Sequence, residues 1–565
     1  MPSPLPDSST IRRRFAIAAI AVAALAVFGL AGRSYTILNG WAQIRRVFLY
    51  NVFFRLFALH ERAFLLLLLA FAVASLCVIP RSVSLRTHWL DALWTRAREL
   101  PAWSAALVVL AATLLGSMLV MHGVGLSMDE FAADFQARIF SSGHISAVIP
   151  QEWRGIAPWM TPTFVTFKKD SFVWLASYLP VYSLLRVPFV FVHAEWLVNP
   201  LLAAVSVWLL DRVARRLWPG DDRRRVVALA FLVTSAQFLV TSMTRYSMPA
   251  HLCFNLLWLL LYLRDDRTGY LALPWVGVLA MGLHNPFPHA LFVAPFLIRL
   301  LFTRRWHWIA YVAAVYLAGS YAWLRWLQFT GAGSMTGTSV GGLLSSFQLP
   351  NATIRFTNGL NLALVFTWQT PVLAIAFVLA LLAWRQLRDA ERDLAVGFLL
   401  TFAFYLLFPA TQGHGWGYRY VYGALGNVVL LGATGTMLAA RALHGQTMKT
   451  LVASSLLLSL VVQLPLRLRE TEAFVRPYAT AMNFLATRPA PLIGVDFRQG
   501  WYSWDLIRND PLFRDGPKVV AMSADWAPPA SVVPPALRDS VYIVTRSEMV
   551  RFGIPLIPLR DGQAP

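Results

Sequence analysis

The chain has 565 residues, of which 57% are hydrophobic and only 14% are charged, against about 25% charged in ordinary soluble domains. This composition excludes a soluble globular protein and indicates a polytopic membrane protein. The net charge of +21 does not favour nucleic-acid binding, because the Arg and Lys residues fall in short clusters between apolar runs, as the positive-inside rule predicts. Cys77 and Cys253 both lie in apolar runs, which argues against a disulfide framework or a cysteine metal site.

The predicted fold class is an all-α polytopic membrane protein with a small C-terminal α/β domain. Arg12, Arg13 and Arg14 precede a first apolar run that is long for a signal peptide, so we expect it to be retained as a span. A segment at 41–59 is expected to lie along the interface. Runs of nearly 20 residues predict about thirteen spans, with these approximate bounds: 15–32, 63–79, 103–122, 194–210, 226–243, 249–263, 271–283, 290–303, 308–328, 361–383, 394–410, a return ending near Arg441, and 450–466.

A long outer loop, 123–193, separates the third span from the fourth. Ser127 with Glu130 three residues later predicts a capping box and a helix that ends near Gly143. Phe131, Phe135 and Ile139 would form an apolar stripe on this helix, suited to lying on a bilayer. Asp134 and Arg138 are spaced to pair with each other.

The second half of this loop, 172–193, is apolar but interrupted by Pro180, Arg186 and Pro188. It is predicted to be a second interfacial helix. If it crossed the membrane, the basic cluster at 212–225 would lie outside, against the positive-inside rule.

The expected domains are 1–102, with N-terminal transmembrane helices and an interfacial segment, 103–466, a transmembrane catalytic module, and 467–565, a soluble outer domain. In this last domain 492–496, 518–522 and 541–545 read as strands and 502–513 as a helix. If the N-terminus lies in the cytoplasm, as we expect, an odd number of spans would place the C-terminal domain on the outer side.

Several of these features resemble the C-type glycosyltransferase (GT-C) superfamily, whose members use polyprenyl-phosphate sugars. They are the Asp129-Glu130 pair opening an interfacial helix, the basic patch Lys168-Lys169, a Tyr-x-Pro motif, and Tyr418-Arg419-Tyr420 in a later loop. The resemblance covers about 103–466. It implies that Asp129 is the general base for the acceptor hydroxyl, that Glu130 orients it or completes the cap, and that no covalent nucleophile is needed. The alternative is that both acids only stabilise the helix start.

A leaving phosphate requires cations. Arg419 is the first candidate, because glycines at 413, 415 and 417 allow close backbone approach and a guanidinium suits phosphate oxygens. Lys168 and Lys169 are the second candidates. The alternatives are an arginine reaching out from a helix end, and lysines that lie near lipid headgroups.

Further possible substrate contacts lie on predicted outer turns: Arg245, His284, His289, His414 and Tyr418. Two prolines separate His284 from His289, and this spacing does not fit a helical metal-ligand pair. The outer loop 245–251 also lacks an acidic residue that many relatives carry. We therefore expect no cofactor, with a divalent metal possible but not favoured.

The function predicted from these residues is transfer of a sugar from a polyprenyl-phosphate donor to an envelope glycan, lipid or protein at the outer face of a bacterial inner membrane. The alternatives are a transporter or flippase of lipid-linked sugars, and a catalytically inactive scaffold. Against transport, no charged residue is predicted at mid-depth of a span, where coupling sites usually lie.

Overall fold

The computed structural model describes residues 8–43, 60–78, 88–330, 350–409, 412, 415–443, 445–514, 516–523, 527–529 and 531–557. Most of the expected interfacial segment 41–59 lies outside these ranges. The helices of the transmembrane part are α1 (Ser8–Gln43), α3 (Glu61–Val78), α4 (His88–Glu99), α5 (Ala102–Leu119), α9 (Val198–Leu217), α10 (Asp222–Val233), α11 (Ala236–Met243), α12 (Met248–Arg264), α13 (Arg267–Met281), α14 (Phe287–Phe302), α15 (Trp306–Thr330), α18 (Ala352–Thr367), α19 (Pro371–Leu382), α20 (Asp389–Leu406), α21 (Leu425–Ala442), α22 (Gly445–Leu458) and α23 (Leu464–Ala486).

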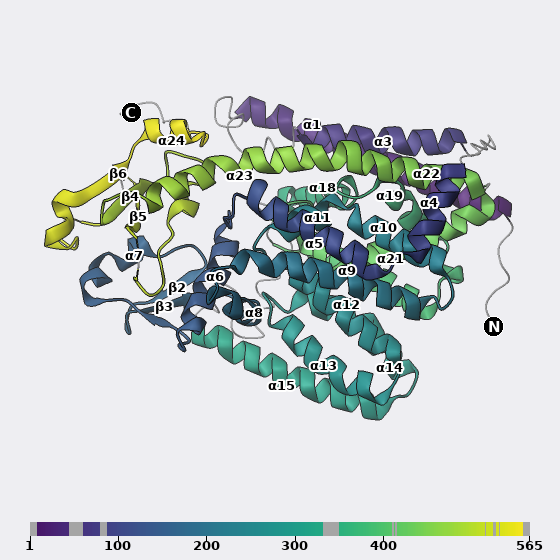
Figure 1. The fold of residues 1–565 in the computed structure, drawn as a ribbon, viewed down its shortest axis with the longest axis horizontal. Coiled ribbons are helices and arrows are strands. Elements are labelled where there is room, and N and C mark those ends of the chain that lie inside the picture. Colours follow the sequence, from purple (N-terminus) through teal and green to yellow (C-terminus); the bar gives the residue numbers. More distant parts are fainter. Residues whose placement is uncertain are drawn as a thin grey trace.

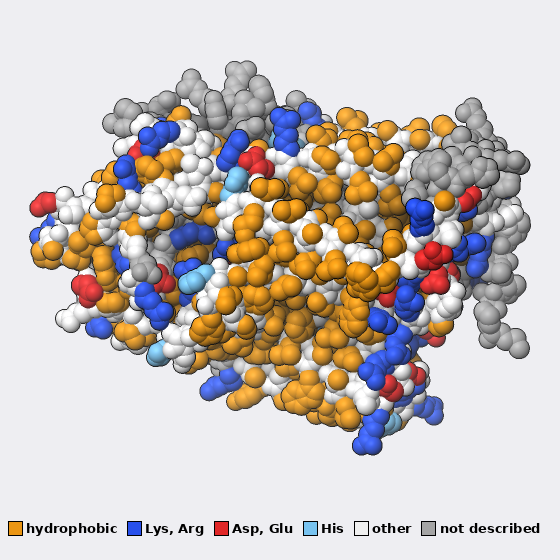
Figure 2. Space-filling view, in the orientation of Figure 1, with side chains coloured by type: hydrophobic (Ala, Val, Ile, Leu, Met, Phe, Trp, Pro, Cys, Tyr) orange, Lys and Arg blue, Asp and Glu red, His pale blue; other side chains and the backbone are white. Residues whose placement is uncertain are grey.

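These helices form an elongated bundle with the N-terminus at one end and the C-terminus at the other (Figure 1). Hydrophobic side chains cover a broad band of its surface, and charged side chains gather at both ends of that band (Figure 2). Six described helices, or up to eight if each bent pair counts as one span, are long and apolar enough to cross a membrane. The all-α membrane class is therefore confirmed, whereas the expected count of about thirteen spans is not.

Two expected spans are bent. The run at 226–243 is divided between α10 and α11, which meet at 51°, and the run at 361–383 is divided between α18 and α19, which meet at 112°. In the second case Pro371 is the first residue of α19, where its missing N–H and fixed φ favour a helix start over helix continuation. Hydropathy alone does not detect such breaks.

The outer loop folds into α6 (Met128–Ser141), a short α7 (Ala157–Met160), an antiparallel sheet in the order β1-β3-β2, and α8 (Val181–Val190). The strands are β1 (Ala147–Val148), β2 (Val165–Lys168) and β3 (Val173–Ala176). The prediction of one interfacial helix over 172–193 is therefore wrong, because strand β3 occupies the first part of this range and only α8 is helical. At about 1.5 Å per residue, α8 is nevertheless too short to cross a bilayer.

The C-terminal part is a small three-stranded parallel sheet in the order β5-β4-β6, formed by β4 (Leu492–Asp496), β5 (Lys518–Met522) and β6 (Val541–Val544). All three predicted strands are present, and α24 (Arg546–Phe552) follows them. The predicted helix at 502–513 is wrong, since only the 3₁₀ turn η7 (Ser503–Leu506) forms there. A continuous helical stretch, Gln446–Ala486, connects this sheet to the bundle.

The apolar stripe of α6 packs against protein and not against lipid. Phe135 and Ile139 are fully buried, and the ring of Phe135 meets Trp174 of β3 at 5.3 Å. Trp174 in turn stacks on Phe513 at 4.9 Å and donates a hydrogen bond to the Pro511 carbonyl at 2.9 Å. The expected bilayer-facing stripe thus joins the outer loop to the C-terminal domain, and the strands that cover it could not be foreseen from helical periodicity.

Candidate active site

A capping box fixes the start of α6, as predicted. The Ser127 hydroxyl accepts a hydrogen bond from the Glu130 N–H at 3.4 Å, and the Glu130 carboxylate accepts one from the Ser127 N–H at 3.3 Å. Two of the otherwise unpaired N–H groups at this helix end are thereby satisfied. The box holds Asp129, the second residue of the helix, at the edge of the transmembrane bundle.

Asp129 is held by groups that are distant in sequence. Its carboxylate accepts a hydrogen bond from Arg419 at 2.8 Å and a short one from the Tyr178 hydroxyl. The ring of His284 lies 4.2 Å from that of Tyr178. Burial opposes ionisation of Asp129, but the Arg419 charge and the Tyr178 hydrogen bond outweigh burial, so the pKa of Asp129 lies below its ordinary value. Asp129 is therefore a carboxylate at neutral pH.

Arg419 is positioned by the turn that precedes it. Gln412 bridges this turn, accepting from the Arg419 N–H at 2.9 Å and donating to the Gly417 carbonyl at 3.0 Å. Gly417 has φ +73°, and a Cβ at Gly415 would lie 2.8 Å from the Arg419 side chain, so both positions require glycine. The guanidinium of Arg419 also lies 5.2 Å from the Tyr246 ring centre, a cation–π arrangement.

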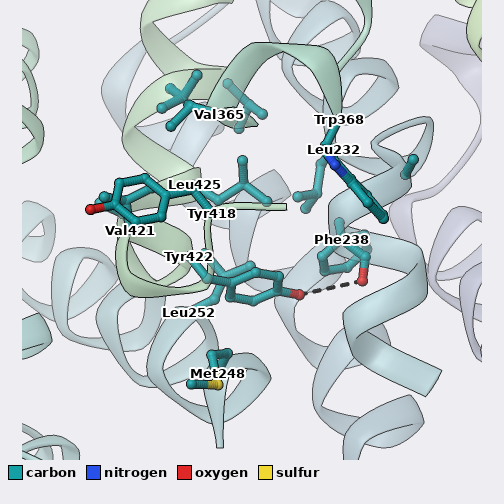
Figure 3. Close-up of a cluster of buried hydrophobic side chains, with 14 of the residues drawn as sticks. Leu232, Phe238, Met248, Leu252, Val365, Trp368, Tyr418, Val421, Tyr422 and Leu425 are labelled. Carbon is teal, nitrogen blue, oxygen red and sulfur yellow. Dashed lines mark hydrogen bonds between the residues drawn. The ribbon is translucent and has the colours of Figure 1, made fainter. Parts of the chain in front are cut away.

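The short helix η5 (Arg419–Ala424) then enters the core, where Tyr422 donates a hydrogen bond to the Phe238 carbonyl at 3.3 Å (Figure 3). Tyr418 packs in the same apolar cluster, close to Val421 and Leu425 (Figure 3). Its ring is fully buried. Tyr418 therefore anchors the loop in the core, and its role as a substrate contact stays a prediction.

Glu130 points away from Asp129 and receives the Arg245 N–H at 2.7 Å. Burial raises the pKa of Glu130, against the hydrogen bonds from Arg245 and Ser127. The Arg245 side chain binds Asp134 at 2.5 Å, and the fully buried Arg186 binds the same carboxylate at 2.6 Å. Burial acts against the charge of Asp134, but Arg186 and Arg245 lower its pKa to about 2. The predicted Asp134–Arg138 pair is therefore wrong, because two arginines from other elements hold Asp134.

The C-terminal domain brings a further carboxyl group, Asp505 of η7, to this region. Asp505 is 8% exposed, and its Oδ2 has no hydrogen-bond partner among the described residues. Burial, together with the charges of Asp129 and Glu130, raises its pKa to about 8 despite the nearby Arg508. The sequence analysis did not identify Asp505 as a site residue. In the sequence it is a single acidic residue in a short predicted helix of a separate domain, and nothing nearby in the chain links it to Asp129.

Three other predicted site residues, Lys168, Lys169 and His289, do not line the cavity beside Asp129. Lys168 donates a hydrogen bond to the Phe329 carbonyl and lies 4.2 Å from the Phe329 ring, and Lys169 is exposed in the following turn. His289 is buried between Asn255 and Tyr316, each at 2.8 Å. His414 lies outside the described residues. Their proposed substrate contacts remain untested.

Asp129, Tyr178, Tyr246 and His284 line a cavity of about 10 Å³, roughly the room for one water molecule. A sugar therefore requires this pocket to open. A second cavity, of about 540 Å³, lies between α6 and the C-terminal domain. Within the described ranges, no cluster of three or more His, Cys, Asp or Glu side chains is arranged to hold a metal ion.

No protein-family model matches the sequence, and no curated protein matches it. Among solved structures, ArnT from Cupriavidus metallidurans bound to undecaprenyl phosphate matches with a TM-score of 0.51 and 14% identity, over 77% of this chain and 89% of ArnT. The apo state of the same ArnT gives a TM-score of 0.45 at 13% identity, over 78% of this chain and 89% of that one.

A likeness at this level of identity defines the fold of the chain. The protein described here therefore has an ArnT-like fold, and the resemblance seen in its sequence is confirmed at the level of the fold.

Proposed function

We propose that this protein is a membrane glycosyltransferase that moves a sugar from a polyprenyl-phosphate donor to an acceptor hydroxyl. The observation that carries the proposal is the pairing of the Asp129 carboxylate with Arg419 at 2.8 Å, beside the small cavity at one end of the bundle. The ArnT-like fold supports a lipid-phosphate donor, since the ArnT structure holds undecaprenyl phosphate. By the resemblance, the site faces the outer side of a bacterial inner membrane, and the acceptor is an envelope glycan, lipid or protein.

In the proposed reaction the acceptor oxygen attacks the anomeric carbon of the donor sugar. The bond between that carbon and the phosphate oxygen breaks, the acceptor proton passes to Asp129, and polyprenyl phosphate leaves. Arg419 stabilises the negative charge that develops on the leaving phosphate. Tyr178, which donates to Asp129, orients the carboxylate.

The pairing of Asp129 with Arg419 affects the basicity of Asp129 in this reaction. As long as Arg419 holds Asp129, the pKa of Asp129 stays low and the carboxylate is a weak base. A donor phosphate competes for the same guanidinium, so its binding releases Asp129 and raises the pKa of this carboxyl. The base would then be activated only when the donor is bound.

The experiment that tests this function is single-turnover transfer in proteoliposomes. A panel of polyprenyl-phosphate sugars is offered to the wild-type protein and to Asp129→Asn, together with an envelope lipid and glycan extract as acceptor. We expect wild type to release free polyprenyl phosphate from one donor and Asp129→Asn to release none. Equal release by the two proteins would contradict the role of Asp129, and translocation of intact donor without any release would favour the flippase alternative.

A further inference from the structure

The larger cavity lies on the opposite face of α6 from Asp129. At about 100° per residue, Phe131, Asp134 and Arg138 project from one side of the helix, and Asp129 and Ala133 from the other. The first three line the cavity of about 540 Å³, and the last two line the small pocket. The cavity is therefore distinct from the Asp129 pocket. Figure 2 shows a hollow between the end of α23 and α6 with Lys or Arg side chains inside it.

Three arginines and two aspartates line this cavity, and its other walls come from the end of α23 and from the segment leading into β5. The charged side chains are Arg138, Arg245, Arg508, Asp134 and Asp510. Asp134 is already shared between Arg245 and the buried Arg186. Among the side chains that line the cavity, arginines therefore outnumber carboxylates by three to two.

Arg508 is the lining arginine whose hydrogen bonds go to backbone carbonyls. Its guanidinium donates to two backbone carbonyls, those of Asp505 at 2.8 Å and Leu126 at 2.6 Å, and lies over the Phe131 ring at 5.1 Å. Burial lowers the pKa of Arg508 to about 10, against the charges of Asp505 and Glu130. A half-buried cation that is held by neutral carbonyls costs desolvation energy, which a bound anion offsets.

Arg138 lies on the same wall and is only loosely paired. Its guanidinium is 3.9 Å from Glu195 and 3.8 Å from Asp510, both beyond hydrogen-bond distance, and its side chain is 41% exposed. It is thus free to turn toward a ligand. Arg508 comes from the C-terminal domain and Arg138 from α6, so a ligand between them would contact both.

We propose that this cavity binds the carboxylate or phosphate of an anionic saccharide, held by Arg508 and Arg138. Its volume falls within the range of about 300–1,000 Å³ typical of small-ligand sites. Asp510 and Asn483, which also line the cavity, are suited to hydrogen-bond sugar hydroxyls. That the ligand is a saccharide rests on the proposed function, and this saccharide would be part of the acceptor. That the ligand is an anion rests on the arginines that line the cavity.

The test is equilibrium titration of the full-length protein in detergent with galacturonate, galactose and inorganic phosphate. We expect wild type to prefer galacturonate to galactose by roughly tenfold or more, the range of a charge-assisted contact. Arg508→Gln and Arg138→Gln should each lose most of this preference. Arg514→Gln, at an exposed position of the same segment, is the matched control and should keep it, and so should Arg419→Gln.

Equal affinity for galacturonate and galactose would overturn the proposal. Loss of the preference in Arg419→Gln but not in Arg138→Gln would also overturn it, by placing the anion at Asp129. Phosphate binding as tight as galacturonate would refute the saccharide part. Because Arg138 makes no short contact, its variant remains informative if Arg508→Gln fails to fold. Galacturonate binding in a protein that transfers no sugar would remove the proposed function and leave this site intact.

Discussion

Asp129 and Arg419 are 290 positions apart in the chain, yet their side chains form a hydrogen-bonded ion pair at 2.8 Å. Asp129 is the second residue of α6, and Arg419 is the first residue of η5, which precedes α21. Both side chains are largely buried, with 15% and 13% of their surface exposed. Removing one partner would leave the other as an uncompensated buried charge, so we expect the pair to separate when a competing ion replaces one partner.

We expect removal of the capping box at the start of α6 to reduce the stability of the protein modestly. Ser127→Ala takes away the oxygen that accepts from the Glu130 N–H, which typically costs about 1 kcal/mol of unfolding free energy. Thermal unfolding in detergent measures this cost. Ser127→Asn should stay close to wild type because asparagine is an equally good cap, and equal losses in both variants would show that packing, not capping, is at stake.

The carboxylate of Asp134 should matter far more for stability. Asp134→Ala leaves Arg186, which is fully buried, without its carboxylate partner, and breaking a buried pair in this way costs about 3–5 kcal/mol. Chemical unfolding checks this value. The control is Arg476→Ala, because Arg476 is exposed and lies 3.6 Å from the half-buried Glu472; this change should cost about 1 kcal/mol or less. Similar losses in the two variants would contradict the buried network.

We expect the stability of the protein to depend on pH through the titration of Asp505. Its pKa rises from 3.8 in the unfolded chain to about 8 in the folded one, so the folded protein keeps a proton that the unfolded chain releases. The stability that Asp505 contributes is complete below about pH 4 and is lost as the pH rises to about 8. We expect the stability of wild type relative to Asp505→Asn to fall across this window. Parallel pH profiles for the two proteins would show that Asp505 is not held protonated.

Docking of the C-terminal domain should depend on Trp174. Trp174→Ala removes the stacking on Phe513 and the hydrogen bond to Pro511, and truncation of a buried Trp typically costs about 3–5 kcal/mol. Limited proteolysis should then cleave between the bundle and the C-terminal sheet. Trp103→Ala, at a position that is 60% exposed, is the control and should leave the cleavage pattern unchanged.

Local signals predicted much of the fold and part of the site. Hydropathy located the apolar helices, the Ser127-Glu130 spacing located the start of α6, and apolar runs bounded by turn residues located all three C-terminal strands. Each of these depends on residues close together in the chain. The glycines around Arg419 were expected to allow a close approach of the backbone, and Gly417 has φ +73°, a conformation that favours glycine.

The features that the sequence did not reveal depend on contacts between segments far apart in the chain. The stripe of Phe131, Phe135 and Ile139 has the same periodicity whether it faces lipid or a sheet, so the sequence could not show that β3 and the C-terminal domain cover it. For the same reason the partners of Asp134 and the approach of Asp505 were missed. The spacing that suggested an Asp134–Arg138 pair was outweighed by two arginines from other elements.

In the proposed reaction Asp129 acts as the base and Arg419 holds the donor phosphate. The most direct measurement compares donor binding and single-turnover release of polyprenyl phosphate in wild type, Asp129→Asn and Arg419→Gln. We expect Asp129→Asn to bind donor at least as well as wild type but to release no polyprenyl phosphate, and we expect Arg419→Gln to lose donor binding by at least about tenfold. Normal release by Asp129→Asn, or unchanged donor binding by Arg419→Gln, would contradict these roles.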